Sequence, residues 1–113
     1  MADKNELFPG TLDMLVLRVL SRGELHGWGI TNKLEQLSQS ALQVDEGSLY
    51  PSLYRMEDKG WIEAESRLTE NNRRAKYYAL TAQGRAALKR ETRDWEVQLA
   101  AITRIMKASP TEA

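Results

Sequence analysis

Two neighbouring groups of polar side chains in this sequence could contact a polyanion such as DNA. The first group has hydroxyls and one cation at helical spacing, and it consists of Ser48, Ser52 and Arg55, flanked by Tyr50 and Tyr54. The second group belongs to a polar stretch rich in turn formers and cations, and it consists of Asn72, Arg73, Arg74 and Lys76. All these residue types donate hydrogen bonds to phosphate oxygens, and arginine also pairs with the acceptors of guanine. The pattern therefore suggests a DNA-binding surface.

The residue types that enzymes use are scarce in this chain of 113 residues. Cysteine is absent, and His26 is the single histidine. A lone imidazole without a carboxylate cluster is a poor metal site and a poor catalytic base, so we interpret His26 as structural. The carboxylate pairs at 45–46 and 57–58 are adjacent in sequence, and neighbouring helical side chains point in different directions. We expect no enzymatic activity, no cofactor and no metal.

Positive charge is concentrated near the polar turn, although the formal net charge of the chain is zero. Residues 1–60 hold six basic and nine acidic side chains, whereas residues 61–113 hold ten and seven. Between Arg67 and Lys76 there are four cations and one anion. The potential near a surface follows the local charge more than the total, so this region can attract phosphates. A neutral total should keep non-specific DNA affinity low and makes binding reliant on two copies.

The segment upstream of the turn has the spacing of a short helix. Apolar residues recur at i, i+4 and i+7 and form its core face: Leu49, Leu53 and Met56. Gly60 ends the helix. Because proline is tolerated in the first turn of a helix and is disruptive deeper inside, Pro51 favours an N-cap near Ser48, or a local distortion if the helix starts at Glu46.

After this helix the hydrophobic period changes to two, as in half-buried strands. The apolar members on one face are Ile62, Ala64, Tyr78 and Leu80. With the polar turn at 69–74 between them, the two segments predict a β-hairpin with a cationic tip. A polar-faced helix followed by such a hairpin is the layout of a winged helix-turn-helix. That unit presents its helix to the major groove and its hairpin to the flanking backbone or minor groove.

Two further helices are predicted before this unit. The first covers 12–21 with Thr11 as its N-cap, and it is apolar on two faces, so it needs two partners. One partner is the core of its own chain. The alternative is a helix fully enclosed by its own chain, but a chain this short can hardly cover both faces. We therefore expect the second face, which carries Met14 and Leu17, to lie against a second subunit. The next helix is expected over about Gly29 to Ser38.

A long helix is predicted after the hairpin, with Thr81 as its N-cap. It continues without proline to about residue 107, and at about 1.5 Å per residue it is roughly 37 Å long, longer than the core requires. Its apolar residues follow a heptad-like pattern, and they are Leu88, Trp95, Leu99, Ile102 and Met106. Such a pattern is typical of a seam between two helices, so it predicts a dimer interface.

The fold class that follows is mainly α with a small β-hairpin: a winged helix-turn-helix with a long C-terminal dimerisation helix. The DNA-binding domain is expected at 8–81, the dimerisation helix at 82–107, and disordered tails at 1–7 and 108–113. No apolar run approaches the ~20 residues that span a bilayer, and no signal peptide is apparent. We expect a cytoplasmic protein without a membrane partner.

Four segments of the sequence resemble PadR-family transcriptional regulators of the short type. They are GTLDMLVLRVL at 10–20, LHGWGI at 25–30, GSLYPSLYRMEDKGWIEAE at 47–65 and NNRRAKYYALTAQGR at 71–85. The combination is specific and extends over roughly residues 8–106. The resemblance implies a homodimer, held by its first and last helices, that represses a promoter. In this family the target is often a transporter or detoxification operon, and release often follows binding of a phenolic or other flat hydrophobic effector.

Several of the site residues have a structural alternative. Arg73 and Arg74 either meet phosphates or belong to a merely solvated turn, and Asn72 could simply form that turn. Tyr50 and Tyr54 either place a hydroxyl on a phosphate or pack against the hairpin or the second helix.

Trp95 either fills the dimer seam or lines a pocket for an aromatic effector between subunits.

Two functions remain open. The first is a homodimeric repressor on a pseudo-palindromic operator with half-sites about 34–36 Å apart. The second is a winged-helix module that dimerises and binds another protein through its hairpin. The operator, the regulated genes and the effector do not follow from the sequence.

Overall fold

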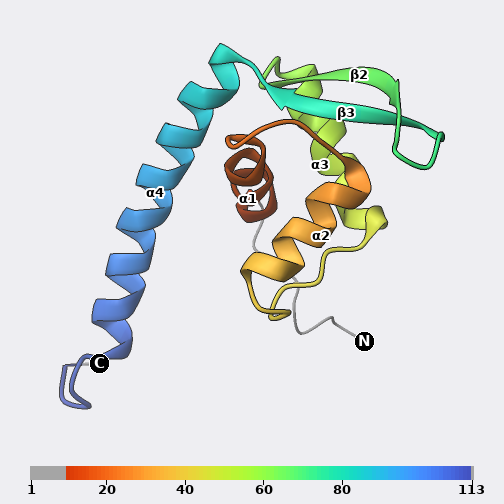
Figure 1. The fold of residues 1–113 in the computed structure, drawn as a ribbon. Coiled ribbons are helices and arrows are strands. Elements are labelled where there is room, and N and C mark those ends of the chain that lie inside the picture. Colours follow the sequence, from red (N-terminus) through yellow and green to blue (C-terminus); the bar gives the residue numbers. More distant parts are fainter. Residues whose placement is uncertain (1–9, 113) are drawn as a thin grey trace.

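The computed structural model describes residues 10–112, which form four helices and a three-stranded antiparallel sheet (Figure 1). The helices are α1 (Thr11–Leu20), α2 (Gly27–Leu37), α3 (Glu46–Asp58) and α4 (Ala82–Met106). The strands are β1 (Leu25–His26), β2 (Ile62–Leu68) and β3 (Arg74–Leu80). The predicted fold class, a mainly helical winged helix-turn-helix with a long C-terminal helix, is confirmed. The predicted tail at 1–7 and the first residues of the predicted domain at 8–81 lie outside the described part.

The core forms around α1, which contacts α2, α3, α4 and β3. The predicted core face of α3 is confirmed, because Leu49, Leu53 and Met56 are fully buried. Tyr78 and Ile62 from the hairpin and Ala87 from α4 close the same cluster. Burial of this apolar surface is the main force that holds the three-helix unit and the hairpin together.

The second apolar face of α1 is covered within the chain, with α4 on one side of the helix and α2 on the other (Figure 1). Leu17 is 0% exposed and Met14 is 8% exposed. Our assignment of Met14 and Leu17 to the dimer interface is therefore wrong. The second partner that an all-round apolar helix needs is supplied by other elements of the same chain, and no area of Leu17 remains for a second subunit.

One predicted helix start is corrected, and for α3 the second of the two open alternatives, a start at Glu46, is observed. The N-cap of α1 is Gly10, in the left-handed region at φ 87°, rather than Thr11. The N-cap of α3 is Asp45, whose carboxylate accepts a hydrogen bond from the Ser48 N–H at 2.8 Å. Pro51 thus lies inside α3 and leaves the carbonyl of Gly47 without its helical partner. Gly47 is exposed, so water can hydrogen-bond this carbonyl.

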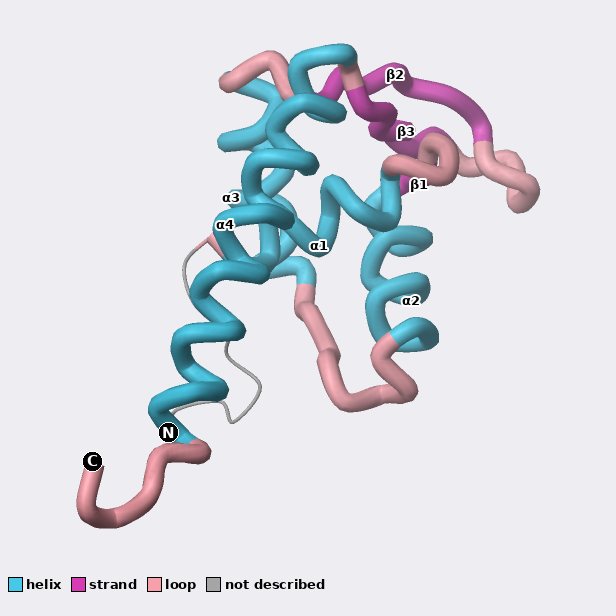
Figure 2. The backbone as a smooth tube through the Cα atoms, turned by 90° about the vertical axis from the view of Figure 1, so that its left-hand side faces the viewer, coloured by secondary structure: helices cyan, strands magenta, loops and turns pink. Residues whose placement is uncertain are grey.

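The strand order of the sheet is β1-β3-β2. Ile62 pairs with Leu80 and Ala64 with Tyr78, so the predicted alternation puts these four side chains on the core side. The hairpin of β2 and β3 extends well beyond the helices (Figure 2). The two-residue strand β1, which pairs with the base of β3, is too short to produce a period and was not predicted.

The start of α4 is fixed to the base of the hairpin. Thr81 is its N-cap as predicted, accepting from the Gly84 N–H at 3.0 Å and donating to the Gly60 carbonyl at 2.6 Å. Gly84 lies so close to the backbone just before β2 that an added Cβ would collide with the Trp61 carbonyl oxygen. The remaining turns of α4 extend away from the core (Figure 1). No helix in 10–112 is long and apolar enough to cross a membrane.

Candidate nucleic-acid interface

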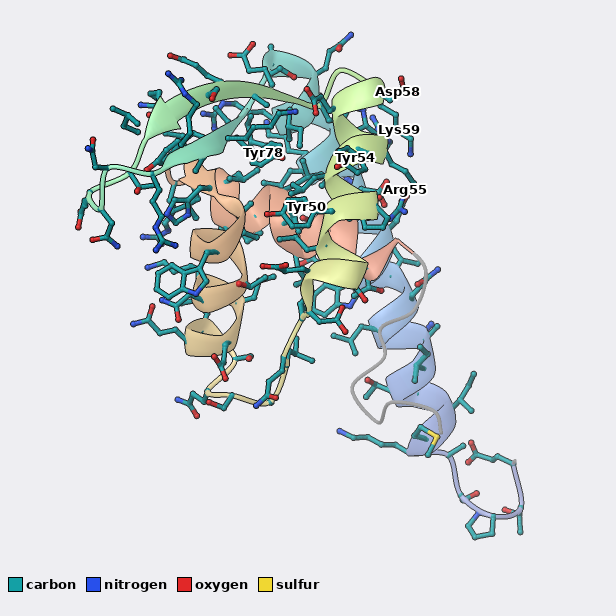
Figure 3. All side chains as sticks on the ribbon, turned by 90° about the vertical axis from the view of Figure 1, so that its right-hand side faces the viewer. Tyr50, Tyr54, Arg55, Asp58, Lys59 and Tyr78 are labelled. Carbon is teal, nitrogen blue, oxygen red and sulfur yellow. The ribbon has the colours of Figure 1, made fainter. Side chains whose placement is uncertain are left out.

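The solvent side of α3 forms a continuous strip of exposed side chains. Its members recur at three- and four-residue spacing, and they are Ser48, Pro51, Tyr54, Arg55 and Asp58. Figure 3 shows Tyr54, Arg55 and Asp58 on the outer side of the helix. Ser48, Tyr54 and Arg55 are thus exposed on this side, and their contact with a groove stays a prediction. Pro51 and Asp58 share the strip and were not predicted, because neither stood out by its chemistry.

Ser52 does not belong to this strip. Its side chain is 0% exposed, and its hydroxyl donates a hydrogen bond of 2.5 Å to Oδ1 of Asp13 on α1. Our assignment of Ser52 to DNA contact is therefore wrong. On a helix of 3.6 residues per turn, position 52 lies about one turn from the buried Leu49 and Met56, at the edge of the core face, where its hydroxyl meets α1. A buried hydroxyl needs a hydrogen-bond partner, and Asp13 supplies it.

Arg55 contacts the same carboxylate from the rim of α3. Its Nη2 lies 2.8 Å from Asp13 Oδ1, while its side chain is still 53% exposed. Asp13 itself is buried and was not recognised from the sequence. The available signal was an acidic residue within the otherwise apolar run of α1, since a carboxylate there must find a partner.

The two tyrosines of α3 have different surroundings. Tyr50 is half-buried and lies over the first turn of α2, where a Cβ added to Gly27 would be 2.6 Å from the tyrosine hydroxyl. This geometry favours the packing alternative for Tyr50. Tyr54 is 61% exposed, and its ring centroid lies 6.5 Å from that of Tyr50. The hydroxyl of Tyr54 therefore stays a candidate for phosphate contact.

The tip of the hairpin is a three-residue loop closed by backbone hydrogen bonds. The Asn72 N–H donates to the Thr69 carbonyl at 2.9 Å, and the Thr69 N–H donates to the Arg73 carbonyl at 2.7 Å. Asn72 has φ 62°, as in loops made of a type I turn and a left-handed residue. The alternative that Asn72 forms the turn is therefore observed. Arg73 and Arg74 are exposed, and none of the ion pairs found within 10–112 involves them.

The two faces of the hairpin have different roles. Side chains alternate along β3, so Arg74 and Lys76 lie on the same face as the buried Tyr78. These cations therefore continue the core face of the hairpin toward its tip, which extends beyond the helices (Figure 2). On the other face, Arg67 stacks over Tyr77 at 4.4 Å and pairs with Glu24. The carboxylate of Glu24, which accepts from the Arg67 guanidinium, raises the pKa of Arg67 above its ordinary value.

His26 has a structural role at the base of this outer face. Its Nδ1 accepts a hydrogen bond of 2.9 Å from the Gly29 N–H and caps α2. Its ring centroid is 5.1 Å from that of Tyr77 on β3. The imidazole therefore joins the start of α2 to the hairpin. Within 10–112 there is no group of three or more side chains that could hold a metal ion.

The long helix α4 has one apolar face in two environments. Leu88 is half-buried and packs on the core, whereas Trp95 is 43% exposed. Leu99, Ile102 and Met106 continue the same face and are also exposed. A hollow with a volume of about 160 Å³ lies along α2 and the loop that follows it. Trp95 does not line this hollow, whose lining residues are Trp28, Thr31, Asn32, Glu35, Gln43 and Val44.

Comparisons with known proteins agree with this geometry. The family described as "Transcriptional regulator PadR-like family" matches residues 16–90. A transcriptional regulator of Mycobacterium tuberculosis is 36% identical over 81 residues, which are 72% of each chain. The negative transcriptional regulator PadR of Bacillus subtilis is 28% identical over 87 residues, 77% of this chain and 46% of that protein.

Solved structures show the same fold. A transcriptional regulator from Clostridium thermocellum superposes with a TM-score of 0.80 at 26% identity, covering 87% of this chain and 95% of the other. A PadR-like transcriptional regulator from Bacillus cereus superposes with a TM-score of 0.74 at 26% identity, covering 88% and 95%.

Proposed function

We propose that this chain, which belongs to the transcriptional regulator PadR-like family, is a homodimeric repressor. Members of this family are regulators that bind DNA, and they are not enzymes. The observation that carries the proposal is that α3 and the hairpin both carry exposed polar and cationic side chains. The exposed strip of α3 offers hydroxyls and one guanidinium, and the hairpin adds Arg73, Arg74 and Lys76 beyond it. A helix of this kind fits a major groove, while the cations of the hairpin suit the neighbouring phosphates.

The apolar face of α4 supports the homodimer. Positions 88, 95, 99, 102 and 106 fall on one side of the helix, and only Leu88 is engaged by the core. A contiguous exposed apolar surface of this kind is typical of an interaction site, and its heptad-like spacing suits a second copy of the same helix. With Met14 and Leu17 excluded, the interface rests on Leu88, Trp95, Leu99, Ile102 and Met106.

The dimer gives the DNA site its expected symmetry. Two copies of α3 must reach successive major grooves on one side of the duplex, so the operator is pseudo-palindromic with half-sites about 34–36 Å apart. The proposed DNA contacts are Ser48, Tyr54 and Arg55 from α3 and Arg73, Arg74 and Lys76 from the hairpin, with Tyr50 and Asn72 holding the scaffold.

We further propose that a small flat hydrophobic or phenolic effector binds at the α4 seam beside Trp95 and changes DNA affinity. The regulated genes would then encode a transporter or a detoxification system. The indole of Trp95 is partly exposed, so its ring can stack on an aromatic ligand. Quenching of Trp95 fluorescence by an aromatic effector, measured with Trp28 and Trp61 replaced by phenylalanine, tests this part.

Two measurements test the proposal as a whole. Gel shifts at low ionic strength with the DNA upstream of its own gene should show a specific complex, and light scattering should give twice the chain mass. Ile102→Asp should yield a monomer with weakened operator binding, because it buries two carboxylates in the seam. Met106→Asp is a milder control at the more exposed end of the helix. A stable wild-type monomer, or a dimer that ignores DNA and binds protein, would contradict the proposal.

A further inference from the structure

The contact between α1 and α3 depends on a buried carboxylate. Asp13 is 7% exposed, and its Oδ1 accepts one hydrogen bond from Ser52 and another from Arg55. Both partners are on α3, 39 and 42 residues away in the sequence. One oxygen of α1 therefore holds two side chains of the helix that we propose to enter the major groove.

Stability alone does not account for an acid at this position. A carboxylate taken out of water loses hydration, and buried ion pairs are often no more stabilising than apolar residues of the same volume. The neighbours of Asp13 in α1, such as Val16 and Leu17, show that this part of the core accepts aliphatic side chains. What an aliphatic residue could not provide is a fixed direction for the guanidinium of Arg55.

The remaining donors of Arg55 are available to a ligand. Guanidinium carries five N–H donors, and the ion pair with Asp13 occupies the Nη2 group from one side. The Arg55 side chain is about half exposed, and it lies on the rim of the α3 strip. An arginine held in this way has already lost much of its rotamer freedom, so less is lost when it binds.

The charge of Asp13 also changes what Arg55 can recognise. A carboxylate 2.8 Å away offsets the positive charge, which reduces the general attraction of Arg55 for phosphate. The carboxylate does not remove the N–H donors of Arg55 that it leaves unoccupied, and these donors keep a fixed direction. Such a guanidinium is better suited to the paired acceptors of a guanine edge than to non-specific backbone contact.

We propose that Asp13 is a positioning residue for DNA recognition, which holds Arg55 so that its free N–H donors discriminate bases in the major groove. The inference rests on the DNA-binding function proposed above. It makes α1 part of the recognition apparatus although Asp13 itself is buried and touches no DNA.

The test uses the duplex that the wild-type dimer enriches from a random pool, and a scrambled duplex of the same length and composition. The measured quantity is the ratio of the two affinities at fixed salt. Arg55→Ala should lower this ratio at least about tenfold, which is about 1.4 kcal/mol. Asp13→Ala and the milder Asp13→Asn should lower it similarly, while affinity for the scrambled duplex stays equal or rises because a cation has been released. The double variant Asp13→Ala/Arg55→Ala should be no worse than Arg55→Ala.

Ser52→Ala is the matched control. It removes the other hydrogen bond to the same oxygen and disturbs the same contact between α1 and α3, but it leaves the ion pair with Arg55 in place. It should lower the melting temperature and keep the affinity ratio of the wild type. Equal ratios for Arg55→Ala and wild type, or a fall in ratio for Ser52→Ala as large as for Asp13→Asn, would overturn the inference. If the wild type enriches no duplex at all, the proposed function fails instead.

Discussion

The two arginines at the hairpin tip give a prediction with a defined magnitude. The variant Arg73→Ala/Arg74→Ala removes two exposed cations without touching the turn, because the loop is closed by backbone groups and by the Thr69 side chain. Each phosphate that a protein neutralises adds about 0.9 to the slope of log affinity against log salt. If both arginines meet phosphates in both subunits, four contacts are lost and the slope becomes shallower by about 3.6.

The consequence is large over an ordinary range of salt. Between 50 and 200 mM, a slope difference of about 3.6 corresponds to about 150-fold in affinity, and a difference of about 1.8, for one contact per subunit, to about 12-fold. Fluorescence anisotropy at four or five salt concentrations measures the slope. The loss should be the same on the selected and the scrambled duplex, since phosphates carry no sequence information.

A charge-matched control separates contact from long-range attraction. Arg104→Ala/Lys107→Ala removes the same two charges from exposed positions at the far end of α4, remote from the hairpin (Figure 1). This control should leave the slope within experimental error of the wild type. A hairpin variant with an unchanged slope, or a control with an equal change, would refute the assignment of the tip to phosphate contact.

Three further changes test the scaffold. Leu53→Ala should lower the free energy of unfolding by about 2–5 kcal/mol in urea titrations, because Leu53 is fully buried. Gly84→Ala should lower the free energy of unfolding by about 1–3 kcal/mol, since its Cβ would collide with the Trp61 carbonyl. The control Ala86→Gly, on the exposed side of α4, should lower it less. Burial raises the pKa of Tyr78 above its ordinary value of 10.0. The stability that its neutral phenol contributes is therefore complete below pH 10.0. It is lost at higher pH, because the phenol ionises more readily in the unfolded chain than in the folded one. The wild type should thus lose more stability than Tyr78→Phe between neutral pH and about pH 11 in chemical unfolding, and parallel losses would contradict this.

Local patterns were sufficient to predict most of the fold. The change of period from 3.6 to 2 between Met56 and Ile62 marks the end of α3 and the start of the hairpin, and both signals are local. Thr81 could be predicted as an N-cap because threonine is a preferred capping residue. The length of α4 followed from an uninterrupted helical pattern.

The errors occurred where the answer depended on distant neighbours. The spacing of Ser48, Ser52 and Arg55 defines a side of α3, but only packing against α1 shows where the core face ends, and Ser52 falls inside it. Similarly, the two apolar faces of α1 required two partners, but the sequence does not say whether they come from one chain or two. At the start of α3, Pro51 left open a cap near Ser48 or a start at Glu46, and the structure has the earlier start because the Asp45 side chain caps the helix.

The central claim is that a dimer places two copies of α3 and two cationic hairpins against one side of a duplex. Hydroxyl-radical footprinting of the wild type on its selected duplex tests this most directly. The proposed dimer predicts two protected windows with centres about 10 base pairs apart on one face, related by the symmetry of the operator. A single protected window, or uniform weak protection along the duplex, would contradict it.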